Sequence, residues 1–390
     1  MNEAYITPKL ISWARNRAHV SIDDLAKKLK VSSAKIQEWE QGDSRPTLNQ
    51  AEKIANNLHI PFGYLFLKNP PEEELPIPDL RTGSKGNIRE ISIDLIDVIN
   101  ETRRRQDAYK EIMINEDIEP LSFIGSLHDI NDPATIARNM RSILKIDRSY
   151  IKKLKTWSDH LNYLVKYAES VGILVFRSGV VKFNTHRALS TDEFRGFTLC
   201  DEIAPVIFIN AVDYKSSQIF TFAHELAHLW IGQPGISNVP PDGFAFGITN
   251  RNENLCDKVA AEFLVPKDEF VSAWNKFTPI KEEVQRLAKI FKVSSLVILR
   301  RSFEMNFISQ SQFYENLEIL KNEIALHERK PKGEGGDFYK TFNTRNSLKF
   351  SSTILEALVD GSMLYREAAN LLNIHVSTLH ELVNRSVLVG

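Results

Sequence analysis

The chain has 390 residues, more than one ordinary hydrophobic core holds, so two or three domains are expected. Its 49 Lys and Arg residues balance 50 Asp and Glu residues, which excludes a general electrostatic attraction to nucleic acid or to a membrane surface. The only cysteines, Cys200 and Cys256, exclude a disulfide framework. The stretch MNEAYITPKL lacks the apolar centre of a signal peptide, and the run PVIFINAV is too short to span a bilayer. These features predict a cytoplasmic protein without a membrane segment.

Short helices separated by tight turns are predicted across residues 1–70. Ser21 can cap the helix SIDDLAKKLK, with Asp24 in the capping-box position three residues later. Gly42 is expected to end the next helix, VSSAKIQEWEQ. These signals predict an all-α N-terminal domain.

The rest of the chain alternates helical and strand-like segments. Residues 71–90 include PEEELPIPDLRTGSKG, whose proline, acid and glycine content is typical of a linker. A helical lead-in is predicted over residues 91–165, and the strand-like runs GILVFRSG, FRGFTL and PVIFIN follow it. A glycine-rich break, KPKGEGGDFYK, interrupts the later helices. We therefore expect a multidomain chain, mainly α with a small β-sheet, with a central α+β domain over 91–310 and a C-terminal helical region over 311–390.

Three segments of the chain resemble one another weakly. LAKKLKVSSAKI (residues 25–36), LAKIFKVSSLVI (287–298) and AANLLNIHVSTL (368–379) all fit a helix, a tight turn and a second helix. The alternative is that an alanine and several leucines at helical spacing simply pack. The irregular spacing excludes a solenoid repeat.

The stretch TFAHELAHLW carries the most specific chemical pattern in the chain. His224 and His228 are four residues apart, so both imidazoles face the same side of a helix and can reach one metal ion. Glu225 projects beside that side, where it can accept a proton from a water molecule. The alternative is a surface helix with two polar histidines. The apolar flanks of the motif and the strand-like run before it favour the metal site.

A zinc ion needs a third protein ligand and an open position for water. Downstream, ENLCDKVAAEFLVP has the apolar spacing of a helix, which we expect to pack on the first. Glu253 and Asp257 are four residues apart on this helix. One carboxylate could bind zinc while the other accepts the remaining N–H of a ligand histidine. This combination is the glutamate-zincin arrangement, with Glu253 as the preferred third ligand.

Other candidates are weaker. Cys256 is expected to fill a small core position, and Glu262 sits nearer the end of its helix than Glu253. His160 and His186 lie in mostly polar stretches and are expected to be solvated. The group that would stabilise an oxyanion stays open among three residues: Tyr214, His186 and Arg195.

The segment FRGFTLCDEIAPVIFINAVDYKSSQIFTFAHELAHLWIG, followed by ENLCDKVAAEFLVP, resembles the ImmA/IrrE family of zinc metallo-endopeptidases. The N-terminal segment PKLISWARNRAHVSIDDLAKKLKVSSAKIQEWEQGDSRPTLNQAEKIANNLHIPFGYLFL resembles the helix-turn-helix of Xre/Cro-type regulators. The proline-rich linker and the tail are similar to those of long members that fuse both domains. The resemblance thus covers nearly the whole chain, and the zinc motif is its most specific part.

The resemblance implies a role for individual residues. His224 and His228 match the family's ligand histidines, Glu253 matches the third Zn²⁺ ligand and Glu225 matches the catalytic glutamate. Asp257 stands where many members have asparagine, and either side chain could orient a histidine.

The resemblance also implies a function. Family members cleave helix-turn-helix repressors and so release genes of phage, mobile-element, stress or defence programmes. We therefore expect a zinc endopeptidase linked to transcription regulation, whose peptidase activity is either constitutive or latent. The alternative is a DNA-binding regulator or antitoxin that uses the zinc fold to bind a partner, such as a toxin, without turnover.

DNA binding would use the first turn of the second helix of the helix-turn-helix. The residues there are Ser32, Ser33, Ala34 and Lys35, and none of them is an arginine or asparagine that reads a base with two hydrogen bonds. Arg45 could contact phosphate. Residues 1–70 contain ten Lys and Arg against seven Asp and Glu, which is only modestly basic. A homodimer would compensate for the weak contacts of one domain.

Overall fold

The computed structural model describes residues 3–71, 91–237, 251–327 and 338–387. Apart from Pro71, the linker predicted over residues 71–90 lies outside the described residues, as does most of the glycine-rich break. The chain divides into two compact units, one formed by residues 1–76 and 89–97 and the other by residues 77–88 and 98–390.

The first unit is a small all-α bundle, as the sequence predicted. Its elements are α1 (Pro8–Arg17), α2 (Ile22–Leu29), α3 (Ser33–Gln41), α4 (Leu48–Asn57) and the 3₁₀ turn η1 (Phe62–Phe66). The hydroxyl of Ser21 accepts a hydrogen bond from the amide of Asp24 at the start of α2, and Gly42 ends α3 with φ +86°. The helices enclose a core in which Leu25, Ile36 and Trp39 are buried.

A four-stranded mixed sheet forms the centre of the second unit. Its order is β1-β5-β4-β6, in which β5 runs parallel to β1 and antiparallel to β4, and β6 pairs antiparallel with the other edge of β4. The strands are β1 (Leu174–Ser178), β4 (Gly196–Leu199), β5 (Val206–Asn210) and β6 (Gly235–Ser237), and a separate hairpin is formed by β2 (Val180–Val181) and β3 (Asn184–Ala188).

The three predicted strand-like runs are confirmed as β1, β4 and β5. The sequence did not predict β2, β3 or β6. Two of these contain only two or three residues, and β3 (NTHRA) is mostly exposed and polar, so none shows the apolar alternation of a half-buried strand.

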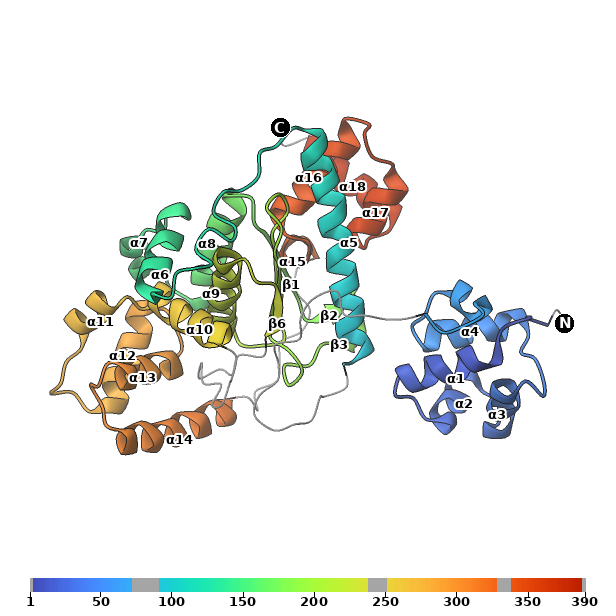
Figure 1. The fold of residues 1–390 in the computed structure, drawn as a ribbon, viewed down its shortest axis with the longest axis horizontal. Coiled ribbons are helices and arrows are strands. Elements are labelled where there is room, and N and C mark those ends of the chain that lie inside the picture. The colour runs from blue at the N-terminus through green and yellow to red at the C-terminus, as the bar shows by residue number, and fades with distance from the viewer. Residues whose placement is uncertain (1–2, 72–90, 238–250, 328–337, 388–390) are drawn as a thin grey trace. The chain divides into compact units, whose positions relative to one another are not determined.

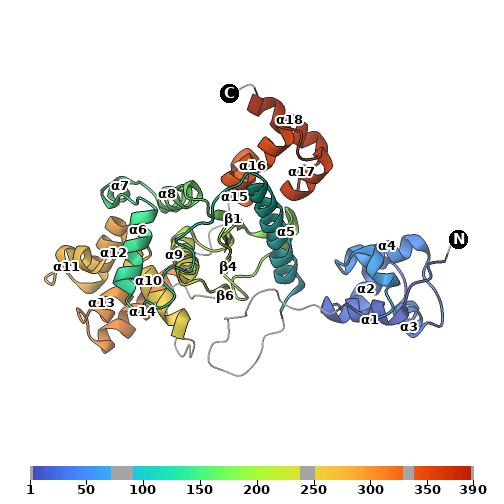
Figure 2. The same ribbon diagram turned by 45° about the horizontal axis from the view of Figure 1, so that its top comes forward.

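The two faces of the sheet pack against different helices. Val175, Ile207 and Ile209 belong to the large core that also contains the apolar residues of α8 (Trp157–Ser170) and α9 (Lys215–Ile231). On the opposite face the rings of Phe197 and Phe208 stack with centroids 4.9 Å apart. α8 and α9 therefore lie on one side of the sheet and α5 (Ile93–Asn115) on the other (Figure 1; Figure 2).

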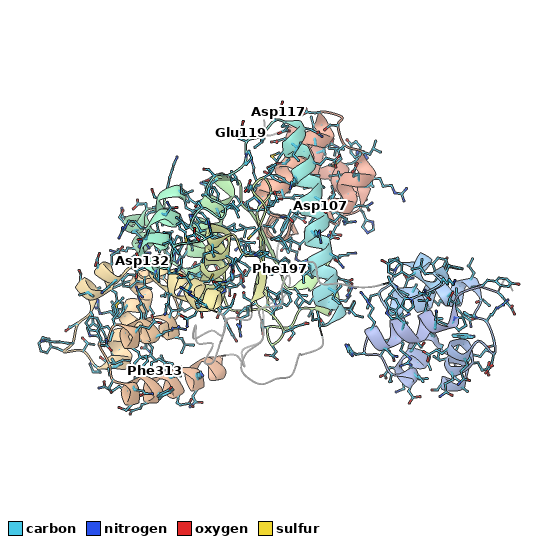
Figure 3. All side chains as sticks on the ribbon, viewed as in Figure 1. Asp107, Asp117, Glu119, Asp132, Phe197 and Phe313 are labelled. Atoms are coloured by element: carbon cyan, nitrogen blue, oxygen red, sulfur yellow. The ribbon has the colours of Figure 1, made fainter. Side chains whose placement is uncertain are left out.

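Further helices surround this centre. Before the sheet come α6 (Pro133–Ile143) and α7 (Arg148–Lys153), and after β6 come α10 (Arg251–Leu264), α11 (Lys267–Ala273), α12 (Ile280–Phe291), α13 (Ser295–Glu304), α14 (Gln310–His327), α15 (Phe338–Asn346), α16 (Leu348–Val359), α17 (Tyr365–Leu372) and α18 (Val376–Val387). α10 packs against both α9 and α6. Phe313 lies on α14 (Figure 3). Its ring stacks on Phe303 of α13, with ring centroids 4.9 Å apart. No helix in the described part of the chain has the length and apolarity needed to cross a bilayer.

The three similar segments share one backbone shape, which confirms the predicted helix, tight turn and second helix. The helix pairs are α2–α3, α12–α13 and α17–α18. In each pair one residue between the helices adopts a left-handed conformation, namely Lys30, Lys292 and Asn373, with φ between 53° and 56°. Asparagine tolerates this conformation better than lysine does.

His160 is buried in α8, so the prediction that it is solvated was wrong, whereas His186 is exposed as predicted. The Nδ1 atom of His160 lies 2.9 Å from the carbonyl oxygen of Lys292, in the turn between α12 and α13. Its Nε2 atom is buried without a hydrogen-bond partner among the described residues. Burial lowers the pKa of His160 to about 4; the Lys292 carbonyl opposes this shift and the charge of Arg148 adds to it.

This shift predicts a loss of stability in mild acid. Because the folded pKa lies below the ordinary value of 6.5, the contribution is fully present above pH 6.5 and is lost as the pH falls toward 4. Between about pH 7 and pH 5 the free energy of unfolding should fall by about 2 kcal/mol from this group. His160→Asn, which keeps a hydrogen-bond donor but does not titrate, should remove that part of the pH dependence in urea unfolding. The exposed His186→Asn is the matched control and should leave the dependence unchanged.

Candidate metal centre

The helix α9 holds the two histidines of the HELAH motif deep inside the second unit. From Ser217 to Ile231 every residue of this helix is buried, because α8, α10 and the sheet surround it. A helix that is buried on all sides carries apolar residues all round. His224, Glu225 and His228 are the exceptions near its C-terminal end, so each of them needs a polar partner.

Both histidines have their Nδ1 atoms engaged by oxygen acceptors. Nδ1 of His224 lies 2.9 Å from Oδ1 of Asp257, and Nδ1 of His228 lies 3.0 Å from the carbonyl oxygen of Gln233. A carbonyl oxygen and an ionised carboxylate only accept hydrogen bonds, so both Nδ1 atoms carry the hydrogen. In its neutral form, with the hydrogen on Nδ1, each ring presents the lone pair of its Nε2 atom to the interior.

Glu253 of α10 completes a convergence of electron-pair donors. The two Nε2 atoms lie 3.1 Å apart, and the Glu253 carboxylate lies 3.0 Å from Nε2 of His228 and 3.4 Å from Nε2 of His224. The three ligand atoms lie within 4.8 Å of one another. Oε1 of Glu253 has no hydrogen-bond partner although it is buried. With both imidazoles neutral and Glu253 ionised, three lone pairs face one point, an arrangement that fits a divalent cation.

The pKa values of His224 and Glu253 also show that positive charge is favoured where the three ligand atoms converge. Burial disfavours the charged form of His224, yet Asp257 and Glu253 raise its pKa well above the ordinary value. Burial likewise disfavours ionised Glu253, but the two imidazoles hold its pKa well below the ordinary value.

The competing ligand candidates lie elsewhere. Cys256 is buried in the apolar core between α9 and α10, and burial, with the nearby carboxylates adding to it, raises the pKa of its thiol well above the ordinary value. Glu262 forms a buried ion pair with Arg301 and accepts a hydrogen bond from the amide of Lys267. Neither side chain belongs to the group of converging ligand atoms.

Glu225 lies beside this group and is held by two hydroxyl groups. Oγ1 of Thr198 lies 2.7 Å from its Oε2 atom, and the hydroxyl of Ser237 contacts its Oε1 atom. Burial raises the pKa of Glu225, and the charges of His228 and His224 and the two hydroxyls oppose the shift. A buried carboxyl group with a raised pKa suits the acceptance and return of a proton.

The whole centre is closed to solvent. The exposed fractions of His224, Glu225 and His228 are 0%, and that of Glu253 is 2%. A peptide substrate therefore has no direct access to these four side chains in this conformation.

The three oxyanion candidates do not gather at the centre. Tyr214 precedes the first residue of α9, about three turns before Glu225, and His186 is exposed on β3. The guanidinium of Arg195 is paired with Asp213. The sequence did not identify Thr198, Ser237 or Gln233 as site residues. Only Thr198 carried a signal, as a polar residue inside an otherwise apolar strand.

The predicted DNA-contacting residues cluster at the start of α3. The hydroxyl of Ser32 accepts a hydrogen bond from the amide of Lys35, and the hydroxyl of Ser33 donates to Asp23. Ala34 is exposed, and Nζ of Lys35 pairs with Glu38 at 2.7 Å. Arg45 lies beyond α3, with its guanidinium 4.1 Å from the centre of the Tyr5 ring.

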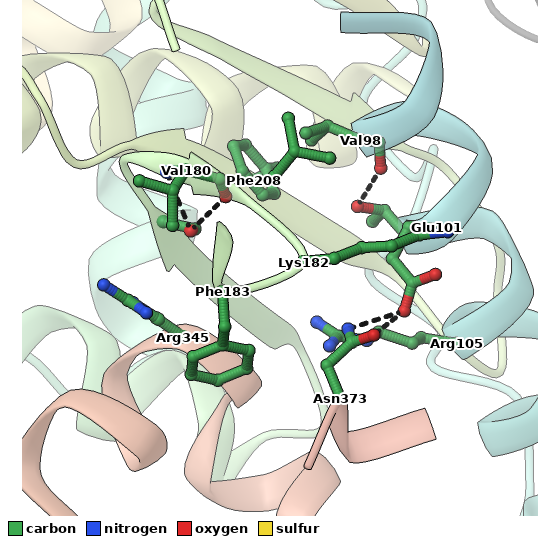
Figure 4. A pocket seen from close by; sticks show the side chains of 12 residues that line it. Val98, Glu101, Arg105, Val180, Lys182, Phe183, Phe208, Arg345 and Asn373 are labelled. Atoms are coloured by element: carbon green, nitrogen blue, oxygen red, sulfur yellow. Dashed lines mark hydrogen bonds and ion pairs between the residues drawn. The ribbon is translucent and has the colours of Figure 1, made fainter. Parts of the chain in front are cut away.

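A separate pocket lies between α5, the β2–β3 hairpin and the C-terminal helices (Figure 4). Glu101 of α5 pairs with Arg105 and accepts a hydrogen bond from Asn373 in the α17–α18 turn. Lys182 and Phe183 lie at the hairpin turn, and the guanidinium of Arg345 lies 4.8 Å from the centre of the Phe183 ring. None of the metal-centre residues lines this pocket.

Comparison with known families agrees with this geometry. Residues 168–303 match a metallopeptidase family, Peptidase M78, and residues 11–65 match the helix-turn-helix family. The first match is described as the IrrE N-terminal-like domain, so the chain carries an N-terminal helix-turn-helix fused to an ImmA/IrrE domain, as the sequence predicted. Residues 346–385 match a domain of unknown function. No curated protein and no solved structure gives a match.

Proposed function

We propose that the protein is a zinc-dependent endopeptidase that cleaves a regulatory protein, such as a helix-turn-helix repressor, in a phage, mobile-element, stress or defence programme. The observation that carries this proposal is the placement of Glu225. Its buried carboxylate lies next to three converging ligand atoms but is not one of them. A purely structural metal site needs no such neighbouring carboxylate.

Each residue of the centre has a role in the proposed chemistry. His224, His228 and Glu253 would hold the ion, and Asp257 would fix the ring of His224 through its Nδ1 atom. A bound zinc ion lowers the pKa of its water to about 7 and polarises a scissile carbonyl. Glu225 would accept the proton of the attacking water and return it to the nitrogen of the leaving amine.

The N-terminal domain supports a regulatory role through DNA, in the cytoplasm. Lys35 is the cationic side chain at the start of α3, and its partner Glu38 is only partly buried. Lys35→Ala in the full chain should reduce the slope of log K against log salt by about 0.9, the value for one lost phosphate contact. Fluorescence anisotropy on DNA from the protein's own promoter region measures this slope. Lys166→Ala, exposed on α8 in the other unit, is the control and should leave it unchanged.

The burial of the centre favours a second candidate function. A site in which all four key side chains are closed to solvent also fits a regulator or antitoxin that binds a partner, such as a toxin, without turnover. The same burial fits a latent peptidase that opens on a signal.

One experiment separates these functions. The full chain is incubated with the products of its neighbouring genes, with and without a chelator, and the mixture is read by intact-protein mass spectrometry. Chelator-sensitive fragments of a helix-turn-helix neighbour support the peptidase. A stable complex with an intact neighbour, unaffected by chelator, supports the binding function and contradicts cleavage of that neighbour.

A further inference from the structure

Two strands supply the hydroxyl groups that contact Glu225. Thr198 belongs to β4 and Ser237 to β6, and both residues are buried. Each contacts a different oxygen of the same carboxylate. The hydroxyl of Thr198 also lies 3.1 Å from the main-chain oxygen of Glu225, but the contact with the carboxylate is shorter at 2.7 Å. Both carboxylate oxygens are thus tied to the sheet.

The pairing of β4 with β6 places these hydroxyls on one face. Gly196 lies opposite Ser237, and Thr198 lies opposite Gly235. Because side chains alternate along a strand, positions 196 and 198 of β4 and position 237 of β6 share the face toward α9. Phe197 points to the other face, where it stacks on Phe208.

The absence of a side chain at Gly196 leaves space for the carboxylate. A Cβ atom there would lie 2.9 Å from Oε1 of Glu225, 2.7 Å from Cγ2 of Thr221 and 3.0 Å from the main-chain oxygen of Phe208. Any larger residue would therefore push the carboxylate or the helix away from β4. We call Gly196, Thr198 and Ser237 together the carboxylate seat.

We propose that the carboxylate seat holds Glu225 away from the metal, so that this side chain acts as a base and not as a fourth protein ligand. Glu225 is next to a ligand histidine, and a free carboxylate at that place would compete for the ion. The seat ties both of its oxygens, and Glu225 stays outside the group of converging ligand atoms. A carboxylate has about four lone-pair sites, so two hydroxyls still leave room for a water molecule.

A merely structural role for the seat makes a different prediction. If the hydroxyls only satisfied a buried carboxylate, their removal would lower the free energy of unfolding and leave the metal coordination unchanged. The metal coordination therefore distinguishes a positioning role from a structural one. This inference rests on the proposed role of Glu225 as the base.

The test uses the visible absorption of Co²⁺ bound to the full-length protein, because these bands weaken when the ion gains a ligand. In the double variant Thr198→Val with Ser237→Ala, Glu225 should bind the ion, and the bands should weaken and shift. Adding Glu225→Gln to this variant should restore the original spectrum, since an amide is a poorer ligand. Thr198→Ser should keep the original spectrum. Thr221→Val, one turn before Glu225 on α9, is the matched control.

Several outcomes would decide the matter. An unchanged spectrum in the folded double variant overturns the inference. If circular dichroism shows that the double variant does not fold, the single variants Thr198→Val and Ser237→Ala replace it. Each single variant should shift the spectrum partly. An unchanged spectrum in both single variants would also overturn the inference. Cleavage by the Glu225→Gln variant with an intact seat would instead refute the proposed function, whatever the spectra.

Discussion

Replacing Glu225 with glutamine should leave the bound metal in place and lower the rate of substrate cleavage by about 100- to 10,000-fold, the usual contribution of a general base. Glutamine has nearly the same shape, so it can still face the hydroxyls of Thr198 and Ser237. It cannot accept a proton from water. Metal content by mass spectrometry and single-turnover cleavage of the identified substrate measure the two effects.

Retained metal together with lost cleavage would support the role of Glu225 as the base. A Glu225→Gln variant that cleaves as fast as the wild-type protein would show that another group is the base. A variant that loses its metal would show that Glu225 supports the ligand group, contrary to its place outside that group.

Replacing Glu253 with glutamine should abolish tight metal binding. The exchange removes the only negative charge among the converging ligand atoms and leaves two imidazoles to hold the ion. The affinity for the metal should fall by more than about 10- to 100-fold, which is the typical loss when a residue that hydrogen-bonds to a metal ligand is removed. Competition with a chromogenic chelator measures the affinity of the full chain.

Two neighbours on α10 provide the comparison for this variant. Asp257→Ala removes only the partner of the Nδ1 atom of His224, so its loss of affinity should stay within about 10- to 100-fold. Cys256→Ala should leave the affinity unchanged, because this side chain lies in the apolar core. An equal effect of Glu253→Gln and Cys256→Ala would contradict the assignment of Glu253 as a ligand.

Local sequence signals predicted the parts of this structure that depend on neighbours along the chain. The caps at Ser21 and Gly42 determine where helices begin and end, and the four-residue spacing of His224 and His228 follows from the geometry of one helix. Glu253 required one further step, the packing of α10 against α9, which the apolar spacing of ENLCDKVAAEFLVP predicted.

The missed features depend on contacts between distant segments. Ser237 reaches Glu225 only because β6 pairs with β4, and a three-residue strand has no periodicity that would reveal its register. His160 is buried because the α12–α13 turn, more than a hundred residues later, covers it. Polar neighbours in the sequence of His160 gave no sign of this contact.

The recurrence of one backbone shape in α2–α3, α12–α13 and α17–α18 has a consequence for how such chains are classified. A search by shape alone would count three DNA-reading modules in the described part of this chain. In the α12–α13 pair, the first turn of α13 is buried through Leu296, Val297 and Ile298. This helix therefore cannot enter a DNA groove and has a structural role inside the protein. α3 and α18 instead begin with solvent-facing residues. A helix pair can therefore bind DNA only if the first turn of its second helix is exposed to solvent. The backbone shape of the pair alone does not distinguish a DNA-binding pair from a structural one.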